Sequence, residues 1–282
     1  MHHSPIRLPF LALGLALASL AGCSKDQNTG PSDLTAQKKD QVEELFPDQS
    51  GTPTTGVLLG QPIAYQKIDG ENIFQGDMML TDAQLDPNQP QTEAAVKDFN
   101  RWPRGVVYYV VSGTLSESMQ NKVYTAMDVM RVNTNNTINF MPRTTEENYV
   151  TFQAARGNGS FVGRKGGEQA IKLAATASMG NVLHEICHTL GFYHEHQRQD
   201  RKKHIKILTE NIRPDHVDNF LAYSAAAGSD LGAFDFGSIM MYGSQAFSAN
   251  GRPTITKLDG SEFTQQRRAL SDGDKAAIQQ MY

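Results

Sequence analysis

The sequence contains very little cysteine, because among its 282 residues only Cys23 and Cys187 carry a thiol. This excludes the disulfide-rich scaffolds of small secreted domains, so the fold must depend on its hydrophobic core and on any metal it binds. Basic clusters are also scarce, with short runs such as 201–204 and a formal net charge of −4. We therefore expect no nucleic-acid partner. The length allows one large domain or two modest ones.

The chain also lacks an apolar run long enough to span a bilayer, since its N-terminal apolar stretch covers only 8–20. Preceded by Arg7, this stretch has the form of an export signal, which is not part of the mature fold. It ends in LAGC (20–23), which resembles the bacterial lipobox. We predict a signal peptide over 1–22 and a lipid on Cys23 that anchors the exported protein to the cell envelope, at the outer membrane. An ordinary secretory signal with an incidental cysteine is the alternative.

Three regions follow the signal. Residues 23–56 are mostly polar and are predicted to be a tether, with room for a short helix over 36–46. Residues 57–93 alternate short apolar runs with turn signals, and they lack a convincing core of their own. The globular pattern, and with it the main domain over 94–282, begins close to residue 101.

Within the main domain, strands are predicted over 106–112, 137–141 and 149–154, with an edge strand over 170–174. Ser116 can cap a helix that is predicted to run to about residue 132, because the apolar residues that follow Ser116 have helical spacing. A closing helix is predicted over 272–281. The chain before that helix is rich in loops.

Four of the eight histidines lie in the sequence HEICHTLGFYHEH at 184–196. His184 and His188 are four residues apart, so on a helix both imidazoles lie on one face and can hold one metal ion. Glu185 lies at the edge of that face, within reach of a water molecule on the metal.

Gly191 allows a sharp turn after these residues. Glycine readily adopts the left-handed conformation that ends many helices, so the chain can bring His194 back as a third ligand. Three imidazole nitrogens and a water form the open zinc geometry used for hydrolysis. A purely structural interpretation would need three core histidines to stand at metal-ligand spacing by chance.

The longer pattern HExxHxxGxxH is the metzincin signature, and a Met-turn, SIMMY, follows at 238–242. The full pattern HExxHxxGFxHEHxRxDR, at 184–201, resembles the astacin family of zinc endopeptidases. Further matches over 95–282 are Trp102, Pro103, Gly105, Val106, Val107, Val162, Gly163, Arg164, Gly166, Gly167, Asn211, Ile212, Pro214, Asn219, Phe220, Gly243, Ala246, Phe247, Ser248, Leu270 and Ser271. The resemblance implies an α+β fold: a two-lobed, astacin-like metzincin domain with a mixed sheet, a zinc-binding helix and a loop-rich C-terminal lobe.

The resemblance also implies one zinc ion per catalytic domain. His184, His188 and His194 match the zinc ligands of the family, and Glu185 matches its general base. In that role Glu185 takes a proton from water as the water attacks a peptide carbonyl, and passes it to the leaving amine.

Three further roles come from the same resemblance. Met240 matches the methionine that packs under the zinc site. Tyr242 matches an additional ligand that can move away and stabilise the oxyanion, and Glu195 matches the partner of the mature N-terminus. A buried aromatic for Tyr242 and a surface carboxylate for Glu195 are the structural alternatives.

The sequence FQGD at 74–77 resembles a family motif whose aspartate binds the zinc in the inactive precursor. Asp77 is therefore predicted to be a latch, and 57–93 a propeptide. An ordinary turn would also explain these four residues.

The chain departs from the family pattern in several places. It has no disulfide in this domain, where family members commonly have two. Met241 replaces a common histidine in the Met-turn, and Cys187 lies inside the zinc helix, where a small buried hydrophobe is the simplest interpretation.

The predicted function is cleavage of peptide bonds in protein or peptide substrates by a latent, lipid-anchored precursor, expected to be a monomer. A catalytically silent, lipid-anchored binding or adhesion protein on the same scaffold is the main alternative. A zinc hydrolase with a non-protein substrate is a third interpretation.

Overall fold

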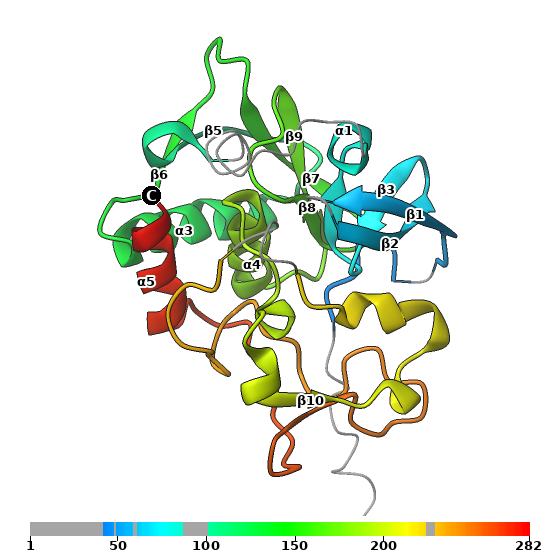
Figure 1. Cartoon of the computed structure of the whole chain (residues 1–282). Coiled ribbons are helices and arrows are strands. Elements are labelled where there is room, and N and C mark those ends of the chain that lie inside the picture. The colour runs from blue at the N-terminus through cyan, green and yellow to red at the C-terminus, as the bar shows by residue number, and fades with distance from the viewer. Residues whose placement is uncertain (1–41, 48, 59–60, 87–100, 224–228) are drawn as a thin grey trace, which may run out of the picture. The chain divides into compact units, whose positions relative to one another are not determined.

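The computed structural model describes residues 42–47, 49–58, 61–86, 101–223 and 229–282 (Figure 1). All of these belong to one unit, which runs from Lys38 to Tyr282. The predicted signal peptide and Cys23 lie outside the described residues. Among the described residues, no helix has the length and apolar content needed to cross a bilayer.

A nine-stranded sheet with the order β1-β2-β3-β4-β8-β9-β7-β5-β6 forms the centre of the fold. Its strands are β1 (Thr52–Leu58), β2 (Gln61–Ile68), β3 (Glu71–Phe74), β4 (Met78–Leu80), β5 (Val106–Val111), β6 (Asn139–Pro142), β7 (Tyr149–Ala155), β8 (Gly159–Phe161) and β9 (Glu168–Ala174). The first four form an antiparallel meander, and β5, β6, β7 and β9 run parallel. The predictions of strands near 106, 137 and 149 are confirmed.

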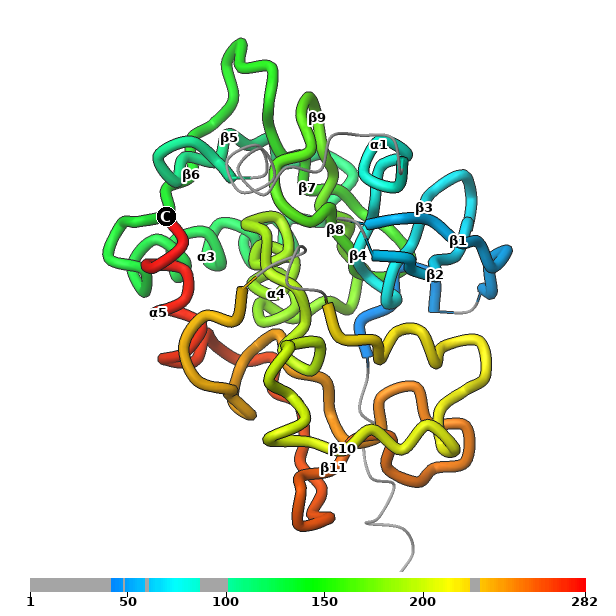
Figure 2. Tube along the Cα trace, viewed as in Figure 1, coloured from blue at the N-terminus to red at the C-terminus, as the bar shows by residue number. Residues whose placement is uncertain are grey.

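Strand β4 joins the two halves of this sheet. It pairs in parallel with β8, so the meander of 52–80 continues the sheet of the main domain, as Figure 2 shows along the Cα trace. Strand β8 itself is antiparallel to β9. The prediction of an edge strand over 170–174 is therefore wrong, because the glycine-rich stretch after β7 contains β8, which covers that edge.

Two long helices pack on the main part of the sheet. Helix α3 (Glu117–Asn133) begins where Ser116 accepts a hydrogen bond from the Met119 amide, as predicted, and its apolar stripe is buried. Helix α4 (Met179–Thr189) packs between α3 and β8, and the Ser160 hydroxyl donates to the Glu185 carbonyl at 2.8 Å. The core between sheet and helices thus fixes the position of α4.

The C-terminal lobe has few regular elements. It contains short 3₁₀ turns, the paired strands β10 (Ile205–Ile207) and β11 (Ile255–Lys257), and helix α5 (Asp272–Met281). A separate apolar cluster that includes Ile255, Phe220 and Tyr242 holds it together. The mixed sheet, few helices and loop-rich lobe confirm the predicted α+β class.

The described residues 42–86, here called the N-terminal segment, differ from the prediction in two ways. Leu45 is only 1% exposed and its amide donates to the Gly76 carbonyl at 2.8 Å, while β1 begins at Thr52. The end of the predicted tether is therefore packed structure. No helix forms over the described residues 42–46 of the predicted 36–46.

The meander has a small apolar core as well, centred on Phe74, Met78 and Leu80, and it includes the helical turn α1 (Asp82–Leu85). The sequence failed to reveal this core because its partners lie on four short strands with little local periodicity.

Candidate metal centre

Helix α4 places the first two histidines. Ser178 caps its N-terminus in a reciprocal pair with Asn181. At its C-terminus Gly191 has φ +106°, and its amide donates to the His188 carbonyl at 2.8 Å. This left-handed glycine is the predicted helix stop, and it returns the chain toward the helix so that His194 reaches the same space as His184.

Each of the three imidazoles is oriented by a hydrogen bond from its Nδ1–H. His184 donates to the Ile239 carbonyl at 2.9 Å, and His188 donates to the Phe192 carbonyl at 2.7 Å. His194 donates to the side-chain oxygen of Gln75 at 3.1 Å. All three Nε2 atoms therefore keep a free lone pair, which is the arrangement that metal-ligating histidines need.

The Asp77 carboxylate lies among these Nε2 atoms. Its Oδ2 is 3.2 Å from those of His184 and His194, and its Oδ1 is 3.7 Å from that of His188. All four residues are fully buried. Burial opposes ionisation of Asp77, but the imidazoles of His194 and His188 outweigh it and hold the pKa of the carboxyl well below its usual range.

This group fits a zinc ion. Burial by itself lowers the pKa of His184, and that of His194 to about 4, and so favours the neutral form in which an imidazole binds a metal. Three lone pairs and a carboxylate then face one another, with ligand atoms within 4.8 Å, and His188 Nε2 and Asp77 Oδ1 have no hydrogen-bond partner. Such a buried group is stable only around a cation, and three nitrogens with one carboxylate oxygen form a set that zinc accepts.

The turn before Asp77 explains its reach. Gln75 and Gly76 both have left-handed backbones, with φ +57° and +92°. A Cβ on Gly76 would lie 2.9 Å from the Glu43 carbonyl oxygen, so the glycine permits this close approach. The turn lies between β3 and β4 and directs the carboxylate into the imidazole group.

Glu185 is completely buried next to His184, and neither of its carboxylate oxygens has a hydrogen-bond partner. Burial, together with the nearby carboxylates of Asp77 and Glu43, raises the pKa of Glu185 well above its usual range. Asp77, His184, His188 and His194 are here called the metal group. A carboxylate beside this group that has a raised pKa and no hydrogen-bond partner is suited to accepting a proton.

Tyr242 packs against the imidazole of His194. Its ring is fully buried, with its centroid 4.4 Å from that of His194, and its hydroxyl donates to the Gln75 carbonyl at 2.7 Å. Burial raises the pKa of this phenol well above its usual range. The hydroxyl is therefore a neutral donor close to the metal group.

The Met-turn (238–242) contacts the metal centre through the Ile239 carbonyl, which orients His184. Met240 is buried in the main core, and its carbonyl accepts a hydrogen bond from the Glu195 amide at 3.0 Å. Ser238 and the Ile239 amide both bond to the carboxylate of Asp274, on α5, at 2.6 and 2.9 Å. The closing helix thereby holds the turn whose Ile239 carbonyl orients His184.

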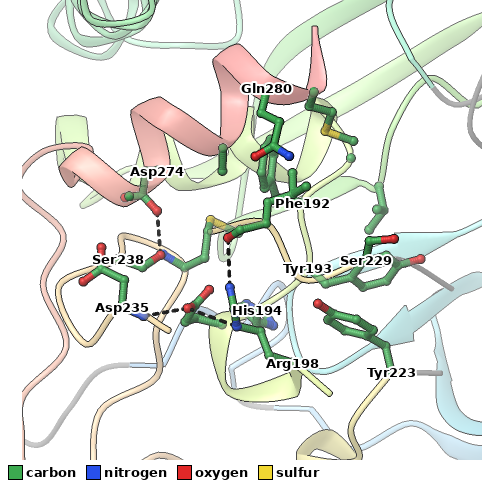
Figure 3. A pocket seen from close by; sticks show the side chains of 18 of the residues that line it. Phe192, Tyr193, His194, Arg198, Tyr223, Ser229, Asp235, Ser238, Asp274 and Gln280 are labelled. Carbon is green, nitrogen blue, oxygen red and sulfur yellow. Dashed lines mark hydrogen bonds and ion pairs between the residues drawn. The ribbon is translucent and has the colours of Figure 1, made fainter. Parts of the chain in front are cut away.

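Glu195 faces a cavity of about 340 Å³ beside the metal group. Figure 3 shows this cavity between Asp274 and Gln280 on α5 and the facing side chains of Tyr193 and Tyr223. Glu195 accepts a hydrogen bond from the Asp235 amide at 2.8 Å, and burial raises its pKa to about 7.

One ion pair at the centre was not foreseen. Glu43 is 3% exposed and forms two hydrogen bonds to the Arg267 guanidinium, at 2.6 and 2.8 Å. It also accepts from Asn181 at the start of α4 at 2.6 Å, and Arg267 donates to the Met241 carbonyl at 3.1 Å. The only sequence signal was an acidic residue next to an apolar pair in a polar stretch, which does not reveal its partner.

Cys187, by contrast, lies in the apolar core and burial raises its pKa well above the usual range. Its sulfur does not belong to the buried metal-ligating group found in the described residues.

Comparison with known proteins agrees with this geometry. The model of the family described as Astacin (Peptidase family M12A) matches residues 94–282. Protein SpAN of Strongylocentrotus purpuratus is 32% identical over 296 residues, which cover 96% of this chain and 47% of that protein. Flavastacin of Elizabethkingia meningoseptica is 31% identical over 288 residues, which cover 95% of this chain and 62% of that protein. The chain thus spans less than two thirds of the length of either relative.

A solved structure adds to this comparison. High choriolytic enzyme 1 of Oryzias latipes, described as a hatching enzyme zinc-protease, is 33% identical with a TM-score of 0.57 and covers 63% of this chain and 90% of its own. Its zinc agrees with the donor set formed by His184, His188 and His194. The chain therefore belongs to the astacin family of zinc metalloendopeptidases.

Proposed function

We propose that this chain is a zinc endopeptidase that cleaves proteins or peptides and is made as a latent precursor, with the N-terminal segment as its propeptide. The observation that carries the proposal is the position of the Asp77 carboxylate among the three imidazole Nε2 atoms, within 3.2 Å of two of them. A carboxylate there takes the place that water or substrate needs.

In the active form, His184, His188 and His194 would hold zinc, which would supply Lewis-acid chemistry at this site. Glu185, which has no competing hydrogen bond, accepts the proton of the attacking water and returns it to the leaving amine. The Tyr242 hydroxyl donates a hydrogen bond to the developing oxyanion. Both residues lie next to the ligating histidines, so neither group has to travel far.

The N-terminal segment blocks this chemistry at several points. The Asp77 carboxylate occupies the space among the three imidazoles, and the Gln75 carbonyl accepts the hydrogen bond of the Tyr242 hydroxyl. Strand β4 pairs with the edge of β8. Removal of one segment therefore frees the metal, the oxyanion donor and the sheet edge together.

Activation is proposed to occur by cleavage near 92–95, a stretch that lies outside the described residues. The new N-terminus would then enter the cavity that Glu195 lines, where a positive amino group would meet a half-buried carboxylate. The Glu195 pairing is supported by the size of the cavity and by the half-buried carboxylate that lines it.

The proposal extends to the location of the precursor. The lipobox at 20–23 supports export and attachment of a lipid to Cys23 at the bacterial envelope. Because the lipid would lie upstream of the activating cut, cleavage would release the catalytic domain from the membrane.

The test compares four proteins on one peptide substrate: the full chain, its Asp77→Ala and Asp77→Asn variants, and the chain cut near 92–95. We expect low activity for the first, raised activity for both variants and the highest for the cut chain, all abolished by a zinc chelator. Asp77→Asn keeps the size of the side chain and removes its charge. An intact full chain as active as the cut form would refute latency. An inactive cut chain with zinc bound and its N-terminal segment removed would refute the peptidase itself.

A further inference from the structure

The fourth histidine of the motif, His196, has no role in the mechanism above, yet it is as buried as the metal ligands. Its ring is stacked on that of Tyr242, with centroids 4.1 Å apart and planes inclined by 23°. We propose that His196 is a positioning residue, a flat platform that holds the Tyr242 ring so that its hydroxyl can donate to the oxyanion. This inference rests on the role proposed for Tyr242.

The platform is itself fixed at two points. The Nε2–H of His196 donates to the Asn219 carbonyl at 2.9 Å, and the His196 carbonyl accepts from Arg201 at 3.0 Å. The Phe220 ring lies next to the imidazole, with centroids 5.6 Å apart. These contacts restrict both the position and the tilt of the ring.

Tyr242 needs such a support once the N-terminal segment has left. Its hydroxyl is held by the Gln75 carbonyl, which belongs to that segment. His196 and Asn219 belong to the main domain, so the stacking contact persists when the hydrogen bond to Gln75 is lost. The ring plane set by His196 then decides where the hydroxyl points.

The loss of kcat expected when the Tyr242 hydroxyl is misplaced can be given a range. Removal of one oxyanion donor lowers kcat by about 100- to 1,000-fold, and a displacement of about 1 Å can cost up to about 100-fold. A tyrosine that keeps its hydroxyl but loses its platform should fall within that range.

Two matched variants separate the flat ring from the hydrogen bond. His196→Phe keeps a flat ring and loses the donor to Asn219, a half-buried residue. His196→Gln keeps a donor and loses the flat ring. Both are measured in the zinc-loaded, proteolytically activated full chain, with and without Tyr242→Phe. Zinc content and the thermal unfolding midpoint are recorded for each.

The proposal predicts that His196→Phe stays within about 3-fold of the unsubstituted kcat, while His196→Gln lowers kcat by about 10-fold or more with little change in KM. In the Tyr242→Phe background, His196→Gln should have almost no further effect, because the group it positions is gone.

Equal loss of kcat from His196→Gln in both backgrounds, or a His196→Phe variant worse than His196→Gln, would overturn the platform. A Tyr242→Phe chain with full kcat would instead refute the proposed role of Tyr242, and the inference would fall with it. If His196→Gln does not retain zinc, His196→Phe alone decides, since a flat ring with normal zinc content must then keep kcat.

Discussion

At the metal centre, the side chains of some residues are fixed by hydrogen bonds, and that of Glu185 is left without any. The three ligating imidazoles each have an outer partner, whereas both oxygens of Glu185 have none. Leaving a buried acceptor unsatisfied costs about 1–3 kcal/mol, so a fold keeps such a group only where it gains something else. At Glu185 the acid–base role proposed above would be that gain.

Replacement of Glu185 by Gln in the activated chain should leave about one zinc per molecule but lower kcat by about 100- to 10,000-fold, since the amide cannot accept the proton. Kinetics on a peptide and metal analysis of the same sample measure both. Cys187→Ala, two positions along the same helix and in the core, serves as the control and should keep nearly full turnover. Near-normal kcat in Glu185→Gln would show that another group is the base.

The residues of the metal group could be predicted from the sequence because their spacing is local. His184, His188 and Gly191 lie within one helix and its stop, so helical geometry alone brings them into register. Gln75 and Arg267 were missed because their roles depend on contacts across 119 and 224 residues. No periodicity links such distant positions.

At the scale of the element, helix α4 depends on how it ends. Gly191 lies in the left-handed region with φ +106°, and the turn that follows carries His194. A Cβ there is disfavoured by the backbone and would approach the terminal methyl of Met281 at 3.1 Å.

Gly191→Ala should therefore cost about 1 kcal/mol or more of stability and weaken zinc retention, because the strain acts on the turn that positions His194. Thermal unfolding and competition with a chelator measure the two effects. Gly251→Ala is the matched control, since that glycine has φ +75°, has open space around it and lies in a loop of the other lobe. It should lower stability alone, and equal loss of zinc from both variants would contradict the argument.

The short stretch 42–46 is a second element, and it connects the N-terminal segment to the rest of the fold through Glu43. Glu43 lies between Arg267 and Asn181, so it ties the N-terminal segment to the Met-turn region and to the zinc helix. Breaking a buried ion pair on one side costs about 3–5 kcal/mol, because it leaves the other charge unpaired.

Glu43→Gln combined with Asp77→Ala should raise the activity of the full chain toward that of the cut form, further than Asp77→Ala alone. Initial rates on a small peptide measure this. Glu44→Gln is the neighbouring control: Glu44 pairs with Arg213 at 3.1 Å where both are partly exposed, and such pairs contribute at most about 1 kcal/mol. The idea fails if the two substitutions act equally.

Helices and strands could likewise be predicted where the signal lies in neighbouring residues, and were missed where they depend on distant contacts. Helix α3 was predicted well because its serine cap and apolar stripe are encoded in neighbouring residues, and the helix predicted over 272–281 coincides with α5. Strand β8 was missed because it has only three residues, two of them small, and its existence depends on β9 and β4 on either side.

At the scale of the whole molecule, the order of parts along the chain determines what one cut achieves. The proposed lipid on Cys23, the N-terminal segment and the catalytic domain follow one another, so the proposed anchoring and latency would share a single connection. Labelling of cells with a palmitate analogue should mark the full chain and the Cys187→Ser control, and it should not mark Cys23→Ser. Activated enzyme should appear in the soluble fraction without label. Label that persists in Cys23→Ser would falsify the lipobox interpretation.

The pairing of β4 with β8 has a kinetic consequence. A cut near 92–95 breaks one peptide bond but leaves that strand pairing, the Glu43–Arg267 ion pair and the Asp77 contacts intact. The nicked molecule is therefore a complex of enzyme and bound inhibitor, whose dissociation follows mass action. Activity should appear after a lag, and its final level per molecule should be higher on dilution than at high concentration. An inhibitor fragment that stays on the membrane while the enzyme diffuses away makes that dissociation effectively irreversible, so the membrane itself would drive activation to completion.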